Sequence, residues 1–477
     1  MVFSSYLFLF YFLPAALVTY YAAPRRAKHL VLTAASYLFY GWANPLFTIL
    51  LLASTLVDYC AGLFLGRSRG FRLQAEDRTP ADRLVLVVSI CANLGLLGFF
   101  KYFNFGAESF DALVSRLGLE GLRLDTALKV TLPLGISFYT FQSMSYTIDV
   151  YRRHAAPVRS FIDFACFVSM FPQLVAGPII RFSEVSDQLR ERTHTLVKFA
   201  RGVAFFCLGM TKKVLLANPC GQIADLAFDS GSVGPLDAWY GVTAYAFQIY
   251  FDFSGYSDMA IGLGLMLGFV FPKNFDSPYL AQSITEFWRR WHISLSTWLR
   301  DYLYLPLGGN RKGPRRTYFN LAIVMLLGGL WHGAAWNFVV WGGVHGGVLA
   351  IERALGKRSL YTAWPTPLRV AATFLVVLVS WVFFRAADLP SAIEYLGAMA
   401  GLTASHEGTA LVAGVIYQPY YLGTFLLAAI VTWACPQTWD WTRRLTAPKA
   451  GAILALFALT VAALATQAYN PFIYFIF

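Results

Sequence analysis

Residues 318–351 read YFNLAIVMLLGGLWHGAAWNFVVWGGVHGGVLAI, and this stretch decides the fold. It holds two apolar runs, 318–331 and 333–351, with His332 between them. A transmembrane helix needs about 20 apolar residues, and fewer when it is tilted or broken. The stretch therefore predicts two membrane-inserted helices with an imidazole at their junction.

The composition of the whole chain is that of a membrane protein. Of 477 residues, 57% are hydrophobic and 13% are charged, whereas about a quarter of the residues of a soluble globular protein are charged. The net charge of +12 is gathered in clusters between apolar runs, which suits anionic lipid and the positive-inside rule rather than nucleic acid. We expect an all-α polytopic protein that forms one integral domain over 1–477 and has no nucleic-acid partner.

The apolar runs predict twelve transmembrane spans: 4–21, 30–43, 45–66, 83–100, 127–148, 236–250, 256–271, 318–331, 333–351, 366–385, 419–436 and 449–467. A further run, 161–180, contains Pro172, Gly177 and Pro178 and has basic residues on both sides, so we expect a re-entrant segment. The basic clusters, among them Lys212 and Lys213, are assigned to the cytoplasmic side. Both termini are then predicted to be periplasmic.

Two carboxylates flank a glycine in Asp252-Phe-Ser-Gly-Tyr-Ser-Asp258, between the runs 236–250 and 256–271. We interpret Gly255 as a helix break. Asp252 and Asp258 then either cap the helix ends and fix the break through backbone hydrogen bonds, or shape a functional cavity, because ionisable groups at membrane depth are costly.

Aromatic and apolar residues recur at helical spacing in 284–301, which predicts one amphipathic helix at the cytoplasmic interface. His292 and Ser296, four positions apart, would share a face of that helix. His292 lies 40 positions (332 minus 292) before His332, and each histidine follows a tryptophan. We interpret the two histidines as one catalytic pair.

His332 is the stronger candidate, since it lies in apolar sequence between Trp331 and small residues, with Asn337 close behind. Burial disfavours a charged imidazole, and a neutral one can act as a general base for a hydroxyl or thiol. A buried, hydrogen-bonded structural histidine is the alternative. We expect His345 to be structural, and we expect no metal, because no carboxylate or cysteine stands at ligand spacing to the histidines.

Long motifs resemble those of the membrane-bound O-acyltransferase family. They are Leu134-Gly-Ile-Ser-Phe-Tyr139, Asp252-Phe-Ser-Gly-Tyr-Ser-Asp-Met-Ala-Ile-Gly-Leu-Gly264, Ser283-Ile-Thr-Glu-Phe-Trp-Arg-Arg-Trp-His-Ile-Ser-Leu-Ser-Thr-Trp-Leu-Arg-Asp301, Leu307-Gly-Gly-Asn-Arg-Lys-Gly313 and Gly328-Gly-Leu-Trp-His-Gly333. The resemblance covers nearly the whole chain, together with the opening Met1-Val-Phe-Ser-Ser.

The resemblance implies a ring of tilted helices around a central tunnel, with interfacial and re-entrant helices beside it. The family's catalytic histidine falls on His332 and its second polar position on His292. The implied reaction takes acetyl from cytoplasmic acetyl-CoA, with no bound cofactor, and passes it across a bacterial inner membrane. Periplasmic acetyltransferase or relay proteins would then O-acetylate an exported polysaccharide, with alginate as the first candidate and peptidoglycan or cellulose as alternatives.

The aromatic tail, Pro471-Phe-Ile-Tyr-Phe-Ile-Phe477, has two interpretations. It is an interfacial anchor, or it inserts into a pocket and presents the hydroxyl of Tyr474. Similar tails of acyl-transfer systems imply Tyr474 as a candidate acyl carrier. A transporter with broken helices and a scaffold that recruits a periplasmic enzyme are the rival functions of the whole chain.

Overall fold

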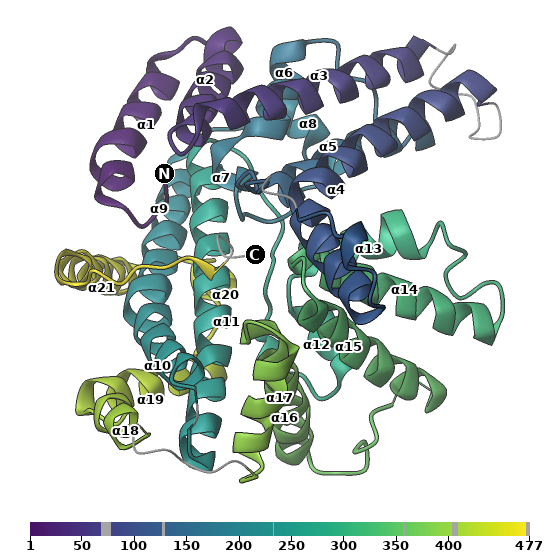
Figure 1. Cartoon of the computed structure of the whole chain (residues 1–477). Helices are drawn as coiled ribbons and strands as arrows, with labels where there is room; N and C mark the ends of the chain where they lie inside the picture. The colour runs from purple at the N-terminus through teal and green to yellow at the C-terminus, as the bar shows by residue number, and fades with distance from the viewer. Residues whose placement is uncertain (68–77, 126–128, 232, 357, 403–408, 474–477) are drawn as a thin grey trace. The chain divides into compact units, whose positions relative to one another are not determined.

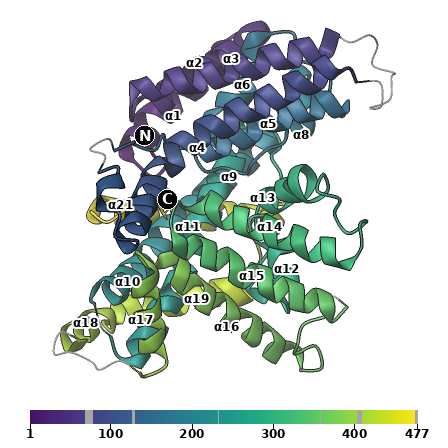
Figure 2. The ribbon, with the colours of Figure 1, turned by 45° about the vertical axis from the view of Figure 1, so that its right-hand side comes forward.

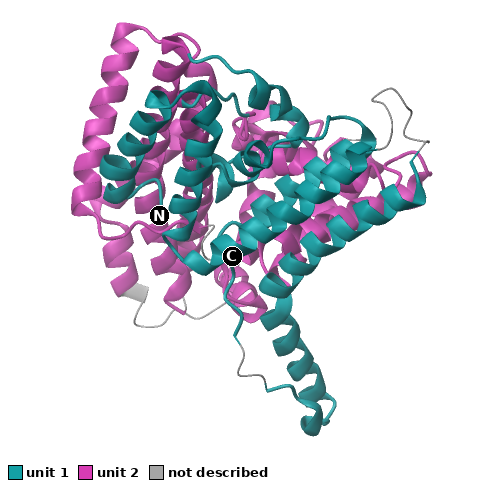
Figure 3. Ribbon diagram, turned by 90° about the horizontal axis from the view of Figure 1, so that it is seen from above, with its two compact units in different colours: residues 1–194, 267–271 teal, residues 195–266, 272–477 magenta. Residues whose placement is uncertain are grey.

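The computed structural model describes residues 1–67, 78–125, 129–231, 233–356, 358–402 and 409–473 (Figure 1). Every regular element within these ranges is helical. The chain forms two compact units, coloured separately in Figure 3: residues 1–194 with 267–271, and residues 195–266 with 272–477. The expectation of a single integral domain stays a prediction.

Four helices are long and apolar enough to cross a membrane: α3 (Pro45–Arg67), α4 (Pro80–Arg116), α16 (Thr366–Arg385) and α21 (Ala447–Thr466). Only 17% of the apolar window of α21 and 22% of that of α4 are buried inside the protein. Apolar helix surface that is left uncovered to this extent fits contact with lipid. The all-α membrane class is confirmed, whereas the ring of twelve spans stays a prediction.

The first unit holds α3 and α4 together with α1 (Leu13–Ala22), α2 (Lys28–Gly41), α5 (Ile136–Arg152), α6 (Phe161–Ser169), α7 (Phe171–Leu174) and α8 (Phe182–Arg190). A buried polar cluster joins α3 to α4. Asp58 accepts hydrogen bonds from Ser89 at 2.6 Å and from Asn93 at 2.9 Å. The predicted re-entrant run is interrupted as expected, because α6 and α7 are short and all residues from 164 to 180 are buried.

The second unit begins with a helical run that sequence analysis missed. It consists of α9 (Leu196–Thr211), the π-helical segment η5 (Lys212–Ala217) and α10 (Asn218–Asp229). This run packs along α11 (Pro235–Met266), as Figure 1 shows. The remaining helices of the unit are α12 (Ile284–Arg290), α13 (Ile293–Leu299), α14 (Pro314–His332), α15 (Trp336–Ala354), α16, α17 (Leu389–Met399), α18 (Thr409–Ile416), α19 (Pro419–Ala434), α20 (Thr438–Trp441) and α21.

The predicted break at Gly255 is wrong, because α11 is one continuous helix of 32 residues. Gly255 serves helix packing instead: a Cβ at this position would lie 2.7 Å from the carbonyl oxygen of Gly209 on α9. Gly202 and Gly262 form an equivalent contact further along the two helices, where a Cβ on Gly202 would lie 2.6 Å from the Gly262 carbonyl oxygen. Small residues allow membrane helices to approach backbone to backbone.

The carboxylates beside Gly255 therefore cap no helix end. Asp258 pairs with Lys212 at 2.7 Å, and Asp252 pairs with Lys213 at 2.7 Å. Both lysines lie within the helical run and face α11, and their assignment to the cytoplasmic side stays a prediction. The closely packed glycines explain this placement, because they bring the neighbouring turns of α9 and α11 within reach of an ion pair.

The glycine contact between α9 and α11 predicts a specific sensitivity. We expect Gly209→Ala to destabilise the protein, since its Cβ would lie 2.5 Å from the Gly255 carbonyl oxygen and overpacking typically costs about 1–3 kcal/mol. The helical Gly343 is the matched control, because a Cβ there meets nothing within 4 Å. Thermal unfolding in detergent should show a lower midpoint for Gly209→Ala alone. Equal midpoints for both variants would contradict the contact.

Candidate active site

The site begins at an interruption between α12 and α13. Arg290 ends α12, Trp291 is extended, and His292 adopts a left-handed conformation with φ of +43°. The interruption is held by backbone pairing with a neighbouring segment: Asp276 N–H donates to Arg290 O and Ile293 N–H donates to Asn274 O, both at 2.9 Å. The prediction of a single helix over 284–301 is wrong, because this pairing replaces the helical hydrogen bonds.

A carboxylate of α15 fixes the start of α12. Glu352 is buried and accepts hydrogen bonds from the N–H groups of Ile284 at 2.8 Å and Thr285 at 2.9 Å. These N–H groups have no partner within their own helix. The carboxylate thereby ties α15 to the segment that carries His292.

His292 is fully buried, and its Nδ1 atom has polar neighbours. Its Nδ1 atom lies 3.3 Å from Oδ1 of Asn274. That oxygen also accepts from the backbone N–H of Ser294 at 3.1 Å and from its hydroxyl at 2.9 Å. The Ser294 hydroxyl oxygen also lies 3.4 Å from Nδ1. Because an amide oxygen only accepts, the Asn274 contact favours the neutral ring with its proton on Nδ1 and its lone pair on Nε2. Within the described chain, Nε2 has no hydrogen-bond partner.

His332 is the last residue of α14 and is 4% exposed. Gly329 lets α15 approach closely, since a Cβ at that position would lie 2.2 Å from the Phe338 carbonyl oxygen. Figure 2 shows α14, α15 and α16 as neighbouring helices. The junction predicted from sequence is thus a tight helix pair with the imidazole at its end.

Aromatic rings surround His332. Trp341 of α15 and Phe384 of α16 each lie 5.2 Å from its ring, measured between centroids, and Trp331 lies 5.0 Å away. The ring of His292 is 6.4 Å from that of His332, and Trp331 also contacts His292, at 5.9 Å. The structure therefore brings the two predicted histidines and Trp331 together.

His332 lines a cavity of about 330 Å³. Its walls are mostly apolar, and its other lining residues are Thr285, Trp288, Arg289, Leu295, Ser296, Leu299, Arg300, Tyr304, Leu321, Val324, Met325, Gly328, Trp341, Leu349 and Arg353. Ser296 thus lines the same cavity as His332. Three arginines, Arg289, Arg300 and Arg353, add positive charge to the lining. A neutral imidazole in such a cavity can take a proton from a bound hydroxyl or thiol.

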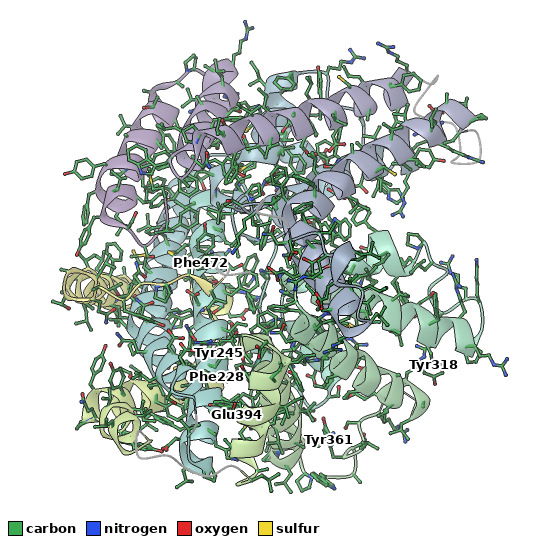
Figure 4. All side chains as sticks on the ribbon, viewed as in Figure 1. Phe228, Tyr245, Tyr318, Tyr361, Glu394 and Phe472 are labelled. Carbon is green, nitrogen blue, oxygen red and sulfur yellow. The ribbon has the colours of Figure 1, made fainter. Side chains whose placement is uncertain are left out.

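A second cavity has a volume of about 320 Å³ and is lined by Arg385, the residue that follows Phe384. Arg385 and Ala386 line it, together with the stacked rings of Phe228 and Tyr395, which are 3.8 Å apart. Figure 4 labels Phe228 and, close to it, Tyr245, with 6.1 Å between the ring centroids. Phe384 therefore contacts the ring of His332 and directly precedes two residues that line the second cavity.

The other predicted site residues that the structure describes do not line the cavity of His332. Asn337 bonds the Phe383 and Ala386 carbonyl oxygens at 3.1 and 2.8 Å, so it fixes the end of α16. Asp252 and Asp258 line neither large cavity. Tyr474 lies outside the described residues. No group of three or more His, Cys, Asp and Glu side chains that could hold a metal occurs in the described ranges.

His345 is structural, as expected. Its Nδ1 atom accepts from the indole N–H of Trp288 at 3.3 Å, and its Nε2 lies 3.1 Å from the Ser380 hydroxyl oxygen. Sequence analysis missed Asn274, Trp341 and Phe384. No spacing in the sequence links these residues to either histidine, because their loops and helices meet only in the folded unit.

Comparisons with known proteins show the family of the chain. The model of the membrane-bound O-acyltransferase family, MBOAT, matches residues 123–387. The chain is 47% identical over 499 aligned positions to a probable alginate O-acetylase AlgI of Pseudomonas putida, and 45% identical over 510 to one of Azotobacter vinelandii; both alignments cover the full length of both chains. A peptidoglycan O-acetyltransferase of Helicobacter pylori is 38% identical over 437 positions, which cover 84% of this chain and 80% of that protein.

The hydrogen bonds predict opposite tautomers for two buried histidines. Nitrogen NMR of the histidine-labelled protein should show His292 protonated at Nδ1 and His345 protonated at Nε2, because a tryptophan N–H can only donate. Asn274→Ala should remove the preference of His292 for a proton on Nδ1 and leave the His345 signals unchanged. An Nε2 proton on His292 of the unmodified protein would be incompatible with the Asn274 contact.

Proposed function

The chain belongs to the membrane-bound O-acyltransferase family and is an O-acyltransferase, and from this premise we propose that it transfers acetyl from acetyl-CoA for the O-acetylation of an exported polysaccharide. The observation that carries this proposal is the meeting of His292 and His332, at 6.4 Å between ring centroids, beside a cavity that His332 lines.

The lining of that cavity supports a phosphorylated thioester as the acetyl donor. Among the described residues, neither Arg289 nor Arg353 forms an ion pair, so both guanidinium groups are available to an anion. Arginine binds phosphate through paired, charge-assisted hydrogen bonds. The apolar walls suit the pantetheine arm, and the end of the cavity at His332 suits the thioester.

The chemistry follows from the two imidazoles. His332 accepts the proton of the acceptor hydroxyl while the hydroxyl oxygen attacks the thioester carbonyl carbon. The carbon–sulfur bond then breaks, and the proton passes to the departing thiolate. His292, whose Nε2 keeps its lone pair, positions a reactant by accepting a hydrogen bond. Base catalysis supplies about 10² to 10⁴-fold, and exclusion of water by the aromatic walls strengthens each electrostatic contact.

The direction of transfer rests on the topology of the second unit. We propose that the helical run 196–229 and α11 cross the membrane as a pair, in place of the pair of spans predicted within 236–271. The basic stretch from Arg289 to Arg316 then remains on the cytoplasmic side by the positive-inside rule. The second cavity would lie on the periplasmic side, since it gathers the end of α10, the start of α11 and the end of α16. This orientation keeps both termini periplasmic in a multi-pass inner-membrane protein.

On the periplasmic side we propose that relay or acetyltransferase proteins receive the acetyl group, and that Tyr474 carries it. Alginate is the proposed polymer, because the relatives from P. putida and A. vinelandii are named alginate O-acetylases. Peptidoglycan is the second candidate, favoured by the name of the H. pylori relative. Cellulose has no such support among these relatives. The unbroken α11 removes one of the helix breaks that favoured a transporter.

Loss of the imidazole at 332 should stop acetyl transfer. We expect His332→Ala to lower the rate of label transfer from radiolabelled acetyl-CoA to polysaccharide, measured in membranes, by about 10² to 10⁴-fold. His154 is the control position, since it is exposed and belongs to the first unit. A rate near that of the unmodified protein, at equal expression, would eliminate His332 as the base.

The two unpaired arginines should set the affinity for acetyl-CoA. We expect the double change Arg289→Gln with Arg353→Gln to raise KM for acetyl-CoA by about 10² to 10⁴-fold, because each of the two lost charge-assisted hydrogen bonds contributes about 1.5–3 kcal/mol. The exposed Arg358 lies close to the end of α15 but outside the cavity lining, so Arg358→Gln is the control. The same KM in all three proteins would exclude this cavity as the donor site.

A further inference from the structure

The carboxyl-terminal segment of the described chain enters the interior of the second unit. Asn218 donates to the Tyr469 carbonyl oxygen at 3.2 Å and to the Asn470 side-chain oxygen at 3.3 Å. Phe472, labelled in Figure 4, stacks on Tyr256 of α11 with 4.5 Å between ring centroids. Phe472 is 6% exposed and Ile473 is 4% exposed. Phe472 and Ile473 are therefore buried rather than laid on an interface.

A buried ion pair binds the backbone of this segment. Lys213 and Asp252 are 2.7 Å apart, with side chains 4% and 2% exposed. Lys213 donates to the carbonyl oxygen of Pro471, and Asp252 accepts from the backbone N–H of Ile473 at 2.8 Å. The two charges thus contact the C=O and the N–H of residues two positions apart, as a receptor for an extended peptide does.

The burial of these charges calls for a reason. A buried ion pair usually adds little net stability, because desolvation offsets the attraction between its charges. Ionisable groups at membrane depth are therefore functional by default. The π-helical segment η5, which carries Lys213, is a further irregularity of a kind that is common at functional sites.

The bound segment and the histidine pair share one buried cluster. Asp252 is followed on α11 by Phe253, whose ring lies 4.6 Å from that of His292. Ile473 belongs to the same hydrophobic cluster as Phe253, Trp341 and Phe384. One turn of α11 thereby contacts the tail through one residue and His292 through the next.

We propose that Lys213 and Asp252 form a docking site for the carboxyl-terminal segment of the chain, and that this site positions the segment beside the histidine pair during acyl transfer. The docking stands on the contacts alone, whereas its role in transfer rests on the proposed function. Lys213 and Asp252 are positioning residues. They act through the tail, which they hold by its backbone and by the buried side chains of Phe472 and Ile473.

Neutralising both charges tests the docking. In Lys213→Met with Asp252→Leu, hydrogen–deuterium exchange of the peptide 467–477 should accelerate at least tenfold. The fold should survive, because apolar replacement of a whole buried ion pair is often neutral or stabilising. The adjacent pair gives a matched control: Lys212→Met with Asp258→Leu removes an ion pair of the same 2.7 Å length and should leave exchange of the tail slow.

A change in the tail itself tests the same contact without altering the helices. Ile473→Pro lacks the N–H that Asp252 accepts, so exchange of the remaining tail amides should accelerate as in the neutralised protein, while Ile473→Val should behave as the unmodified chain. Acetyl transfer from radiolabelled acetyl-CoA should fall at least tenfold in both proteins whose tail is released, the Ile473→Pro variant and the Lys213→Met with Asp252→Leu variant. It should fall no further when the neutralised pair is combined with deletion of 471–477.

The outcomes separate the two parts of the proposal. Unchanged exchange in the Ile473→Pro protein and in the neutralised protein would overturn the docking. Accelerated exchange with unchanged transfer, or an additive loss in the combined variant, would overturn the positioning role. Absence of any acetyl transfer by the unmodified protein would instead count against the proposed function, and the exchange result would still decide the docking.

Discussion

Close backbone contact between glycine-lined helices is the constraint on which the second unit depends. Gly209 and Gly255 join α9 to α11, and Gly329 joins α14 to α15. Membrane helices gain little from the hydrophobic effect among themselves, so close van der Waals contact and interhelical polar contacts carry their association. At the first contact the shared backbone surface brings a lysine–aspartate pair together. At the second it encloses an imidazole among aromatic rings.

The two histidines are held in different ways, and the difference matters for their chemistry. His292 is fixed by a chain interruption and by Asn274, whose side-chain oxygen favours a proton on Nδ1. His332 ends a helix and lines a cavity that carries positive charge. One imidazole is thus a preorganised hydrogen-bond acceptor, and the other borders the space that a substrate can enter. Preorganisation of this kind reduces the reorganisation that a reaction requires.

Hydrophobic runs predicted individual helices well. The expected span 366–385 coincides with α16, and 45–66 differs from α3 by one residue. The same signal failed where polar residues are satisfied inside the protein. Lys212 and Lys213 interrupt an apolar run, so the helices on either side of them were missed, although both lysines pair with α11. Gly255 indicated a break because glycine disfavours helix in isolation, whereas tertiary packing favours it here.

The same contrast applies to the site. Motifs predicted His292, Ser296, Trp331 and His332 as site residues, and the structure places Trp331 beside both histidines and Ser296 in the same cavity lining as His332. Asn274, Phe384 and the tail contacts of Asp252 were not, since they depend on long-range pairing that no local spacing encodes. The local geometry of His292 was also missed, because its interruption requires the neighbouring segment at 274–276.

A structure of the protein with a thioether analogue of acetyl-CoA tests the central claim most directly. The analogue's acyl carbon should lie beside His332, with the position of the attacking oxygen within about 3 Å of an imidazole nitrogen, and its phosphates should contact Arg289 and Arg353. An analogue bound elsewhere, or one separated from His332 by the rings of Trp341 and Phe384, would contradict the assignment of this cavity as the acyl-transfer site.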